Sequence, residues 1–306
     1  MKKLIRGAVV GLVAALALSA CGSGDSGDDN PLAGGGESGT ITVGGANFPE
    51  SNLLGEIYAQ ALEAKKLKVT RKFNIGAREV YYDQVVKGGL SVVPEYNGAL
   101  LTTSVDKSSA AATTEEINAA LKAKLPAAVE ILNSAQAEDK DSVTVNAQTA
   151  AKYNLKSITD LGPVAKNLVI AGPSEFKTRR QGLVGLKDVY GLDFKKFQPF
   201  DAGAQATLVK LLSENEIQAA DLFTTDPTIQ QNKLVVLEDP KHVFSAQNVT
   251  PLIHKSSVNA TARAALNAVS AKLTTQDLLD MMKRIAIDKE DQEKVAEDWL
   301  KKSGLA

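Results

Sequence analysis

Strand-like and helix-like segments alternate along this 306-residue chain from Thr40 onward. Residues 40–43 alternate polar and apolar side chains, and the apolar residues of 51–65 recur at the spacing of one helix face. Residues 68–73 again have the alternation of a strand. Repeated alternation of this kind predicts an α/β fold with largely parallel sheets.

The same alternation continues to the end of the chain. Short apolar runs predict further strands at 90–93, 142–145, 168–171 and 234–237. Helical spacing of apolar residues predicts helices at 78–87, 114–135, 204–213, 260–271, 275–287 and 290–302.

The N-terminus has the three regions of a signal peptide. Lys2, Lys3 and Arg6 precede an apolar run over 8–18, which is too short to span a bilayer. The following Leu-Ser-Ala-Cys at 18–21 resembles the lipobox of bacterial lipoproteins. That resemblance implies cleavage after residue 20 and an extracytoplasmic protein anchored to the cell membrane by lipid on Cys21. Ordinary secretory cleavage beside a stray cysteine is the alternative.

Cys21 is the only cysteine, so its lipidation leaves no thiol for a disulfide, a zinc-thiolate site or a nucleophile. Residues 22–39 are almost entirely Gly, Ser, Asp, Asn and Pro, a composition that predicts a flexible tether over 21–39. Loss of three basic residues with the signal peptide changes the net charge from −1 to −4, which argues against a nucleic-acid partner. The lipid is the only membrane contact that we expect.

Motifs for metal or nucleotide chemistry are lacking in the sequence. His242 and His254 have no ligand-spaced partners, and Gly44-Gly45 is not followed by the Gly-Lys-Ser/Thr of a phosphate loop. We therefore expect no metal and no cofactor.

Two loops after strands have the character of ligand-facing segments. Asn47 to Ser51 lies between a strand and a helix, so Ser51 can cap the helix and first-turn N–H groups can face an anion. The segment 94–98 places Tyr96 and Asn97 in a similar position. Spacing alone leaves a helix cap and a packed turn as equally good interpretations.

Four ordered blocks, at 41–50, 55–63, 74–82 and 94–98, resemble the substrate-binding proteins of bacterial ABC importers for quaternary amines such as glycine betaine, choline and carnitine. The similarity continues at 153–161, 175–179, 224–226 and 296–300. It implies a two-lobe, type II periplasmic-binding-protein-like α/β fold with a ligand cleft between the lobes. Residues 40–140 and 249–306 would form lobe I, and 141–248 lobe II.

The resemblance further implies a monomer that passes an osmoprotectant solute to an ABC permease with its ATPase subunit. Family pockets hold a trimethylammonium group in an aromatic cage by cation–π attraction and a ligand carboxylate by basic side chains. Tyr96, Asp139 and Arg179 match pocket positions. Phe223, Gln247 and Asp141 stand where cage tyrosines are frequent. The complete expected ligand-binding set is Asn47, Ser51, Tyr96, Asn97, Asp139, Asp141, Arg179, Phe223, Thr225 and Gln247.

Three alternatives remain open at this level. The ligand could be an ergothioneine-like betaine or a polyphenol-like aromatic, because Gln247, Asp139 and Asp141 add hydrogen-bonding capacity. A surface enzyme would use Glu95 with those two aspartates. A structural or adhesive lipoprotein would need none of them.

Overall fold

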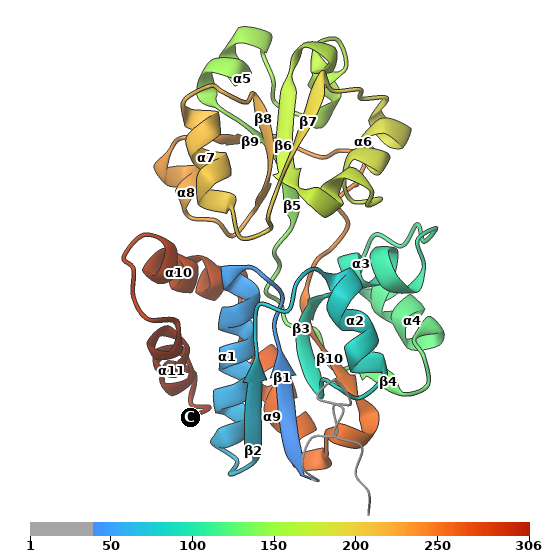
Figure 1. Cartoon of the computed structure of the whole chain (residues 1–306), viewed down its shortest axis with the longest axis vertical. Coiled ribbons are helices and arrows are strands. Elements are labelled where there is room, and N and C mark those ends of the chain that lie inside the picture. The colour runs from blue at the N-terminus through green and yellow to red at the C-terminus, as the bar shows by residue number, and fades with distance from the viewer. Residues whose placement is uncertain (1–38) are drawn as a thin grey trace, which may run out of the picture. The chain divides into compact units, whose positions relative to one another are not determined.

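The computed structural model describes residues 39–306, in which two five-stranded sheets carry helices on both sides (Figure 1). The first sheet has the order β2-β1-β3-β10-β4, with strands at Thr40–Gly44 (β1), Lys68–Lys72 (β2), Val92–Tyr96 (β3), Val129–Ile131 (β4) and Val249–His254 (β10). The second has the order β7-β6-β8-β5-β9, with strands at Asp141–Val145 (β5), Val169–Pro173 (β6), Lys196–Phe200 (β7), Ala219–Phe223 (β8) and Val235–Val236 (β9). We call these sheets, with their helices, lobe I and lobe II.

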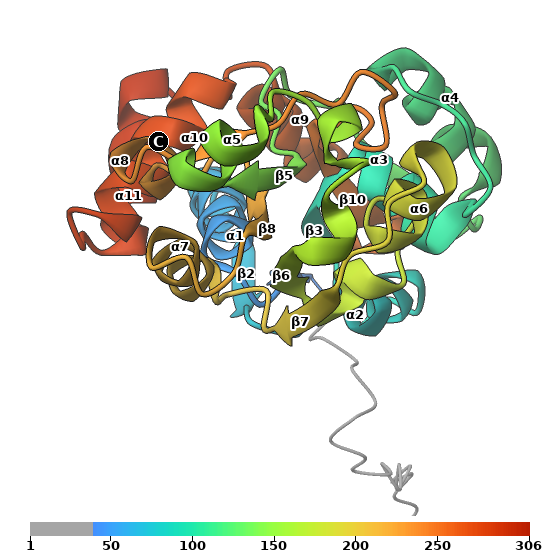
Figure 2. The same cartoon turned by 90° about the horizontal axis from the view of Figure 1, so that it is seen from above.

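Lobe I carries helices from both ends of the described chain. They are α1 (Pro49–Glu63), α2 (Arg78–Val86), α3 (Asn97–Leu100), the π-helical turn Leu101–Val105, α4 (Thr114–Lys124), α9 (Ala260–Ser270), α10 (Thr275–Ala286) and α11 (Gln292–Ser303). Figures 1 and 2 show α10 and α11 beside α1, with α4 toward the opposite side of the lobe. Lobe II carries α5 (Ala147–Tyr153), α6 (Leu183–Tyr190), α7 (Gln205–Ser213) and α8 (Thr228–Gln231).

Helix α1 forms the centre of the lobe I core. Pro49 is the first residue of the helix, a position that favours proline because its N–H would have no partner there and its fixed φ suits the helix. Leu53, Leu54 and Ile57 are fully buried. Trp299 of α11 packs into the same cluster, so the C-terminal helices complete a core that begins at the N-terminal strand. Ser51 does not cap this helix as we expected. It lies in the first turn, and its hydroxyl accepts the N–H of Ala46 at 2.9 Å.

Both sheets are mixed, so the expectation of largely parallel sheets is wrong. β1 and β6 run parallel to their neighbours, whereas β10 is antiparallel to β3 and β4, and β5 is antiparallel to β8 and β9. The register shows the antiparallel direction of β5, since its first residue, Asp141, pairs with the last residue of β8, Phe223. β5 and β10 each begin at the end of their sheet where the neighbouring strands β8 and β3 finish. Each therefore runs in the opposite direction to that neighbour.

The helix expected over 114–135 ends at Lys124. Leu125 precedes Pro126 and has φ −61° and ψ 144°, an extended conformation that the following proline ring favours. The chain then forms β4, which the helical spacing concealed. Strands β7, β8 and β10 and helices α5 and α6 were also not predicted. No helix within residues 39–306 is both long and apolar enough to cross a membrane.

Candidate ligand-binding cleft

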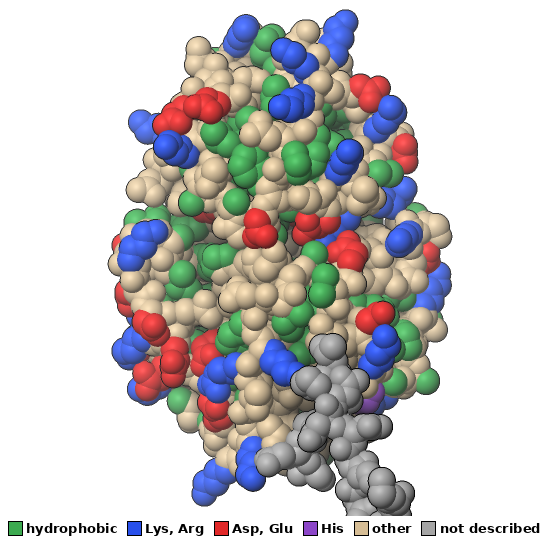
Figure 3. All heavy atoms as spheres, viewed as in Figure 1, with side chains coloured by type: hydrophobic (Ala, Val, Ile, Leu, Met, Phe, Trp, Pro, Cys, Tyr) green, Lys and Arg blue, Asp and Glu red, His purple; other side chains and the backbone are tan. Residues whose placement is uncertain are grey.

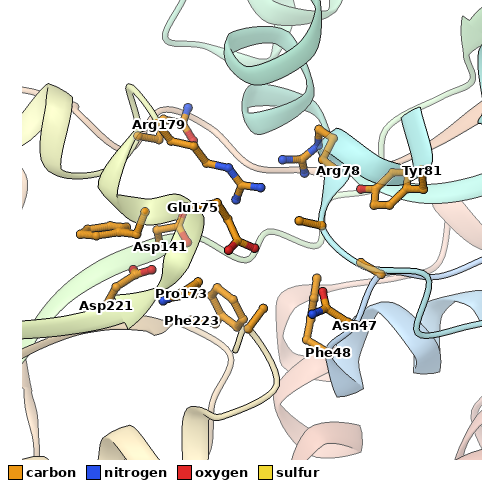
Figure 4. Close-up of a pocket in the computed structure, with 15 residues that line it drawn as sticks. Asn47, Phe48, Arg78, Tyr81, Asp141, Pro173, Glu175, Arg179, Asp221 and Phe223 are labelled. Atoms are coloured by element: carbon orange, nitrogen blue, oxygen red, sulfur yellow. The ribbon is translucent and has the colours of Figure 1, made fainter. Parts of the chain in front are cut away.

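A cavity of about 50 Å³ lies between the two lobes and is lined by both. Lobe I contributes the loop after β1, including Asn47 and Phe48, and the start of α2 with Arg78 and Tyr81. Lobe II contributes the cleft-side ends of β5, β6 and β8 and the turn after β6: Asp141, Pro173, Glu175, Arg179, Asp221 and Phe223 (Figure 4). The carboxyl ends of strands in open α/β sheets are the usual place for a ligand.

Several side-chain contacts join the lobes around this cavity. Thr225 donates its hydroxyl to Glu50 at 2.5 Å, and Asn47 Nδ2 donates to Asp201 at 3.1 Å. Arg179 reaches from lobe II to Glu79 of α2 at 2.9 Å. Polar bonds therefore connect the two lobes beside the cavity.

Two guanidinium groups approach the cavity from opposite lobes (Figure 4). Arg78 is buried and is held by Glu95, with its Nη2 2.8 Å from Oε2. Glu95 is fully buried and also accepts the Tyr81 hydroxyl at 2.8 Å. Arg179 is held by Glu79 and, against the opposing effect of partial burial, lowers the pKa of that carboxyl. Because each arginine is oriented by its own glutamate, the pair can receive a ligand carboxylate between them.

The lobe II side of the cavity is acidic. Burial raises the pKa of Asp141 to about 6, although Arg179 and Arg78 act in the opposite direction. Burial, and then the negative charge of Asp141, hold the pKa of Asp221 well above its usual value. On the face drawn in Figure 3, acidic side chains gather where the lobes meet. These aspartates favour a cation in the cleft.

Behind the cavity, a second acidic pair forms part of a hydrogen-bond network. Glu50 accepts from Tyr96 and Thr225, and Asp139 accepts from the Thr225 N–H and the Thr224 hydroxyl. Burial raises the pKa of Glu50, and burial with the charge of Glu50 raises that of Asp139. The pair stabilises the contact between lobes rather than the cavity wall.

Aromatic rings line the cavity, but they do not form an open cage. Phe48 of lobe I and Phe223 of lobe II lie 5.3 Å apart between ring centroids and are both partly exposed. Phe176 and Tyr81 also line the cavity, yet both are buried and held in their own lobes. Two rings are therefore available to face a cation.

Four of the residues expected to bind ligand line the cavity: Asn47, Asp141, Arg179 and Phe223. Three others, Tyr96, Asp139 and Thr225, belong to the network behind it. The remaining three hold backbone near the cleft. Ser51 accepts the Ala46 N–H, Asn97 accepts the N–H groups of Gly98 and Asn248, and Gln247 accepts the Ala99 N–H and donates to Gln181.

The structure adds lining residues that our sequence reasoning did not select. Phe48, Arg78 and Tyr81 stood inside blocks that carried the family resemblance, so the signal for them was present. Asp221 stood as a single acid in the apolar strand Ala219–Phe223, a pattern that is itself a signal of a special site. Glu175 is the first residue of the matching block 175–179, so a signal was present for it as well.

The three carboxylates considered for an enzymatic site lie in separate environments. Glu95 is bound to Arg78, Asp139 to the turn at Thr225, and Asp141 faces the cavity. Within the described part of the chain, no three His, Cys, Asp or Glu side chains are grouped to hold a metal ion.

The sequence is similar to proteins of transport systems. Residues 39–302 match the model of the substrate-binding domain of ABC-type glycine betaine transport systems. The glycine betaine-binding protein YehZ of Escherichia coli K12 is 26% identical over 276 residues, covering 86% of this chain and 90% of that one. The ergothioneine transport permease/ergothioneine binding protein EgtU of Helicobacter pylori G27 is 24% identical over 262 residues; the match covers 84% of this chain but only 46% of EgtU.

Solved structures share the fold. A crystal structure of a glycine betaine/carnitine/choline ABC transporter protein aligns with TM-score 0.68 and 21% identity, covering 87% of this chain and 99% of that one. Lactococcal OpuAC in its closed, glycine betaine-bound form aligns with TM-score 0.60 and 17% identity over 86% and 96% of the two chains. With the two-lobe fold and its cleft, the match over residues 39–302 shows that this chain belongs to the family of substrate-binding domains of ABC-type glycine betaine transport systems.

Proposed function

We propose that this protein captures a small solute of the betaine or quaternary-amine class outside the cytoplasm and delivers it to an ABC permease and its ATPase subunit. The cleft carries this proposal, because both lobes line it and Thr225, Asn47 and Arg179 bond across it. A ligand that contacts both lobes favours the closed form, which a permease can distinguish from the open one.

The two ends of a zwitterion fit the two kinds of wall. A ligand carboxylate would lie between Arg78 and Arg179, and its cationic group beside Phe48, Phe223 and the aspartates of lobe II. A desolvated cation–π contact contributes about 2 kcal/mol.

A thermal-shift screen of the purified mature protein tests this function. Glycine betaine, choline, carnitine and ergothioneine are added singly at millimolar concentration, with a polyphenol as the contrasting ligand. At about 100 times its Kd, a ligand stabilises the folded state by about 2.7 kcal/mol, which raises Tm by roughly 5–10 °C in a chain of this size. No shift with any of the amines would overturn the assignment.

Replacement of Thr225 by valine should weaken ligand binding about three- to tenfold. The exchange removes the hydroxyl that bonds to Glu50 across the lobes, and such a bond contributes about 1 kcal/mol to the closed form. Titration calorimetry measures the effect, and Thr159→Val on the exposed surface of lobe II is the matched control. Equal affinities of the two variants would show that this bond does not stabilise closure.

We propose lobe boundaries at 140/141 and 248/249. The chain passes between the lobes at these two points, so the hinge would lie there. Glu138 and Asn248 form an isolated antiparallel bridge there, and the Asp139 N–H donates to the Gln247 carbonyl at 3.2 Å. Two short paired connections suit a hinge, because few residues have to change conformation when the lobes move.

Anchorage through Cys21 is part of the same proposal, and this residue lies outside the described range. Membrane attachment would keep the cleft near the permease. Replacement of Cys21 by serine should release the protein from the membrane fraction, as immunoblotting of cell fractions measures. Unchanged retention would contradict a lipid anchor.

A further inference from the structure

Two carboxyl groups lie against each other where the lobes meet, behind the cavity. Glu50 of α1 is 2% exposed and Asp139, in the first connection between the lobes, is 7% exposed. Their side chains form a hydrogen bond with each other. Such a bond needs a proton on one of the two groups, since ionised carboxylates are acceptors only. The pair therefore holds one proton in this arrangement of the lobes.

The other hydrogen-bond partners of the pair do not replace this proton. Tyr96 donates its hydroxyl to Glu50 Oε1 at 2.5 Å, and Thr225 donates its hydroxyl to Oε2 at 2.5 Å. Asp139 Oδ1 accepts the Thr225 N–H and the Thr224 hydroxyl, both at 3.1 Å, which leaves Oδ2 for the other acid. All of these donors already point at a carboxyl oxygen, so the contact between the two acids depends on the proton that they share.

The groups around the pair favour the protonated form. Those that face it are acids or a neutral phenol: Asp226, Asp141, Asp221 and Tyr96. The adjacent Lys140 pairs instead with Glu138, at 3.0 Å. Burial, followed by the charge of Glu50, holds the pKa of Asp139 well above its usual value, and burial raises that of Glu50. Loss of the proton would bury two like charges side by side.

Both lobes are needed to build this environment. Glu50 belongs to lobe I, whereas Thr224 and Thr225 belong to lobe II and bind the pair from the other side. Separation of the lobes about the hinge would withdraw both threonines and admit water to the two carboxyl groups. Hydrated carboxyl groups have a pKa of about 4, so the open form would release the shared proton at neutral pH.

We propose that closure of the lobes over a ligand takes up one proton, which Glu50 and Asp139 share, and that this contribution makes ligand binding tighter at lower pH. The inference rests on the proposed transport function and adds a proton to its binding step. Between the ordinary carboxyl pKa and the raised value of the pair, the closed form keeps a proton that the open form has lost, so affinity falls as pH rises. One proton changes the affinity by as much as about tenfold per pH unit in this range.

Titration calorimetry at pH 7 counts the proton. Glycine betaine, choline, carnitine and ergothioneine serve as ligands, because none of them changes its charge between pH 5.5 and pH 8. Each is titrated in phosphate and in MOPS, two buffers with different enthalpies of protonation. The difference between the two observed binding enthalpies gives the number of protons that bind with the ligand.

The variant Asp139→Asn isolates the contribution of the pair. Its amide can donate to Glu50 in place of the shared proton, while its oxygen still accepts the Thr225 N–H. We expect this variant to take up about one proton fewer per ligand than the wild type. Its affinity should fall at least about tenfold less between pH 5.5 and pH 8. The comparison removes the effect of Asp141 and Asp221, whose ionisation favours a cation and therefore acts with the opposite sign.

Two further variants complete the test. Glu50→Gln makes the same exchange on the other member of the pair, with an amide that can donate to Asp139, and should also take up fewer protons. Asp188→Asn, on the exposed surface of lobe II, should behave as the wild type. Equal proton uptake and equal pH dependence in the wild type, Asp139→Asn and Glu50→Gln overturn the inference and leave the transport function intact. Absence of binding by all four ligands overturns the transport function as well.

Discussion

Replacement of Glu95 by alanine is expected to lower the free energy of unfolding by about 3–5 kcal/mol, one of the largest effects available in this chain. Glu95 is fully buried, and it accepts hydrogen bonds from the Arg78 guanidinium and from the Tyr81 hydroxyl. Its removal leaves a buried guanidinium without a counter-charge and a buried phenol without an acceptor. Arg78 also lines the cleft, so ligand binding should weaken in the same variant.

Urea denaturation at neutral pH measures the loss, and two further variants identify its cause. Glu95→Gln restores an acceptor without the charge, so its stability should lie between those of the wild type and Glu95→Ala. Arg78→Met combined with Glu95→Leu removes both charges and should recover much of the loss. The matched exposed pair is Lys87 and Asp83, 3.8 Å apart, where Asp83→Ala should cost less than about 1 kcal/mol. A similarly small loss in Glu95→Ala would contradict the role of the buried pair.

The second large effect concerns pH: the ligand-free protein should be more stable at pH 5 than at pH 8. Burial raises the pKa of Asp141 from 3.8 to about 6 and that of Asp221 further above its usual value. Between pH 4 and these raised values the folded state keeps protons that the unfolded chain has lost, so stability falls as pH rises. Between pH 5 and pH 8, the shift of Asp141 alone corresponds to about 1.4 kcal/mol, because about one pH unit separates pH 5 from its raised pKa.

The groups around these aspartates determine the size of the effect. Asp141 is faced by Arg179, Arg78 and Glu175, and Asp221 by Asp141, Arg179 and Asp139. Glu50 and Asp139 contribute with the same sign, because their pKa values are also raised. Carboxyls with a lowered pKa, such as that of Glu79, are ionised in both states above pH 5 and do not change the slope there.

Denaturation of the wild type and of the double variant Asp141→Asn/Asp221→Asn, at pH 5 and pH 8, measures this contribution. The variant should be more stable than the wild type at pH 8, and the difference in stability between the two pH values should fall by at least about 1.4 kcal/mol. Asp188→Asn should behave as the wild type. An unchanged pH dependence in the double variant would show that other groups cause the loss of stability at high pH.

Sequence patterns predicted the elements whose periodicity is long or bounded by clear signals. The helix α1 and the three closing helices were expected within a few residues of their observed ends, because their apolar faces repeat over several turns. Short or edge strands such as β4 and β7 were missed, since three to five residues carry little periodicity. Pro126 was the available signal that the helix beginning at Thr114 could not continue.

The binding cleft shows the same division. Matching blocks of sequence indicated the loops of lobe I and Arg179, and the structure brings Asn47, Asp141, Arg179 and Phe223 to one cavity. Tyr96 and Asp139 lie behind this cavity. Strand register and the neighbouring helices decide whether a side chain faces the cavity or the hydrogen-bond network behind it. Position along the chain does not contain that information.

The order of residues alone was sufficient for the α/β class and the family resemblance, because each depends on contiguous segments, and it is the basis of the predicted export signal with its single cysteine. Tertiary structure decided the mixed strand directions, the pairing of Arg78 with Glu95 and the burial of Asp221 beside the cavity. These features arise where residues far apart in the chain meet, as Asn47 and Asp221 do at one cavity. Burial and partner choice, which set the charge state and the hydrogen-bonding needs of a side chain, exist only after those segments have packed.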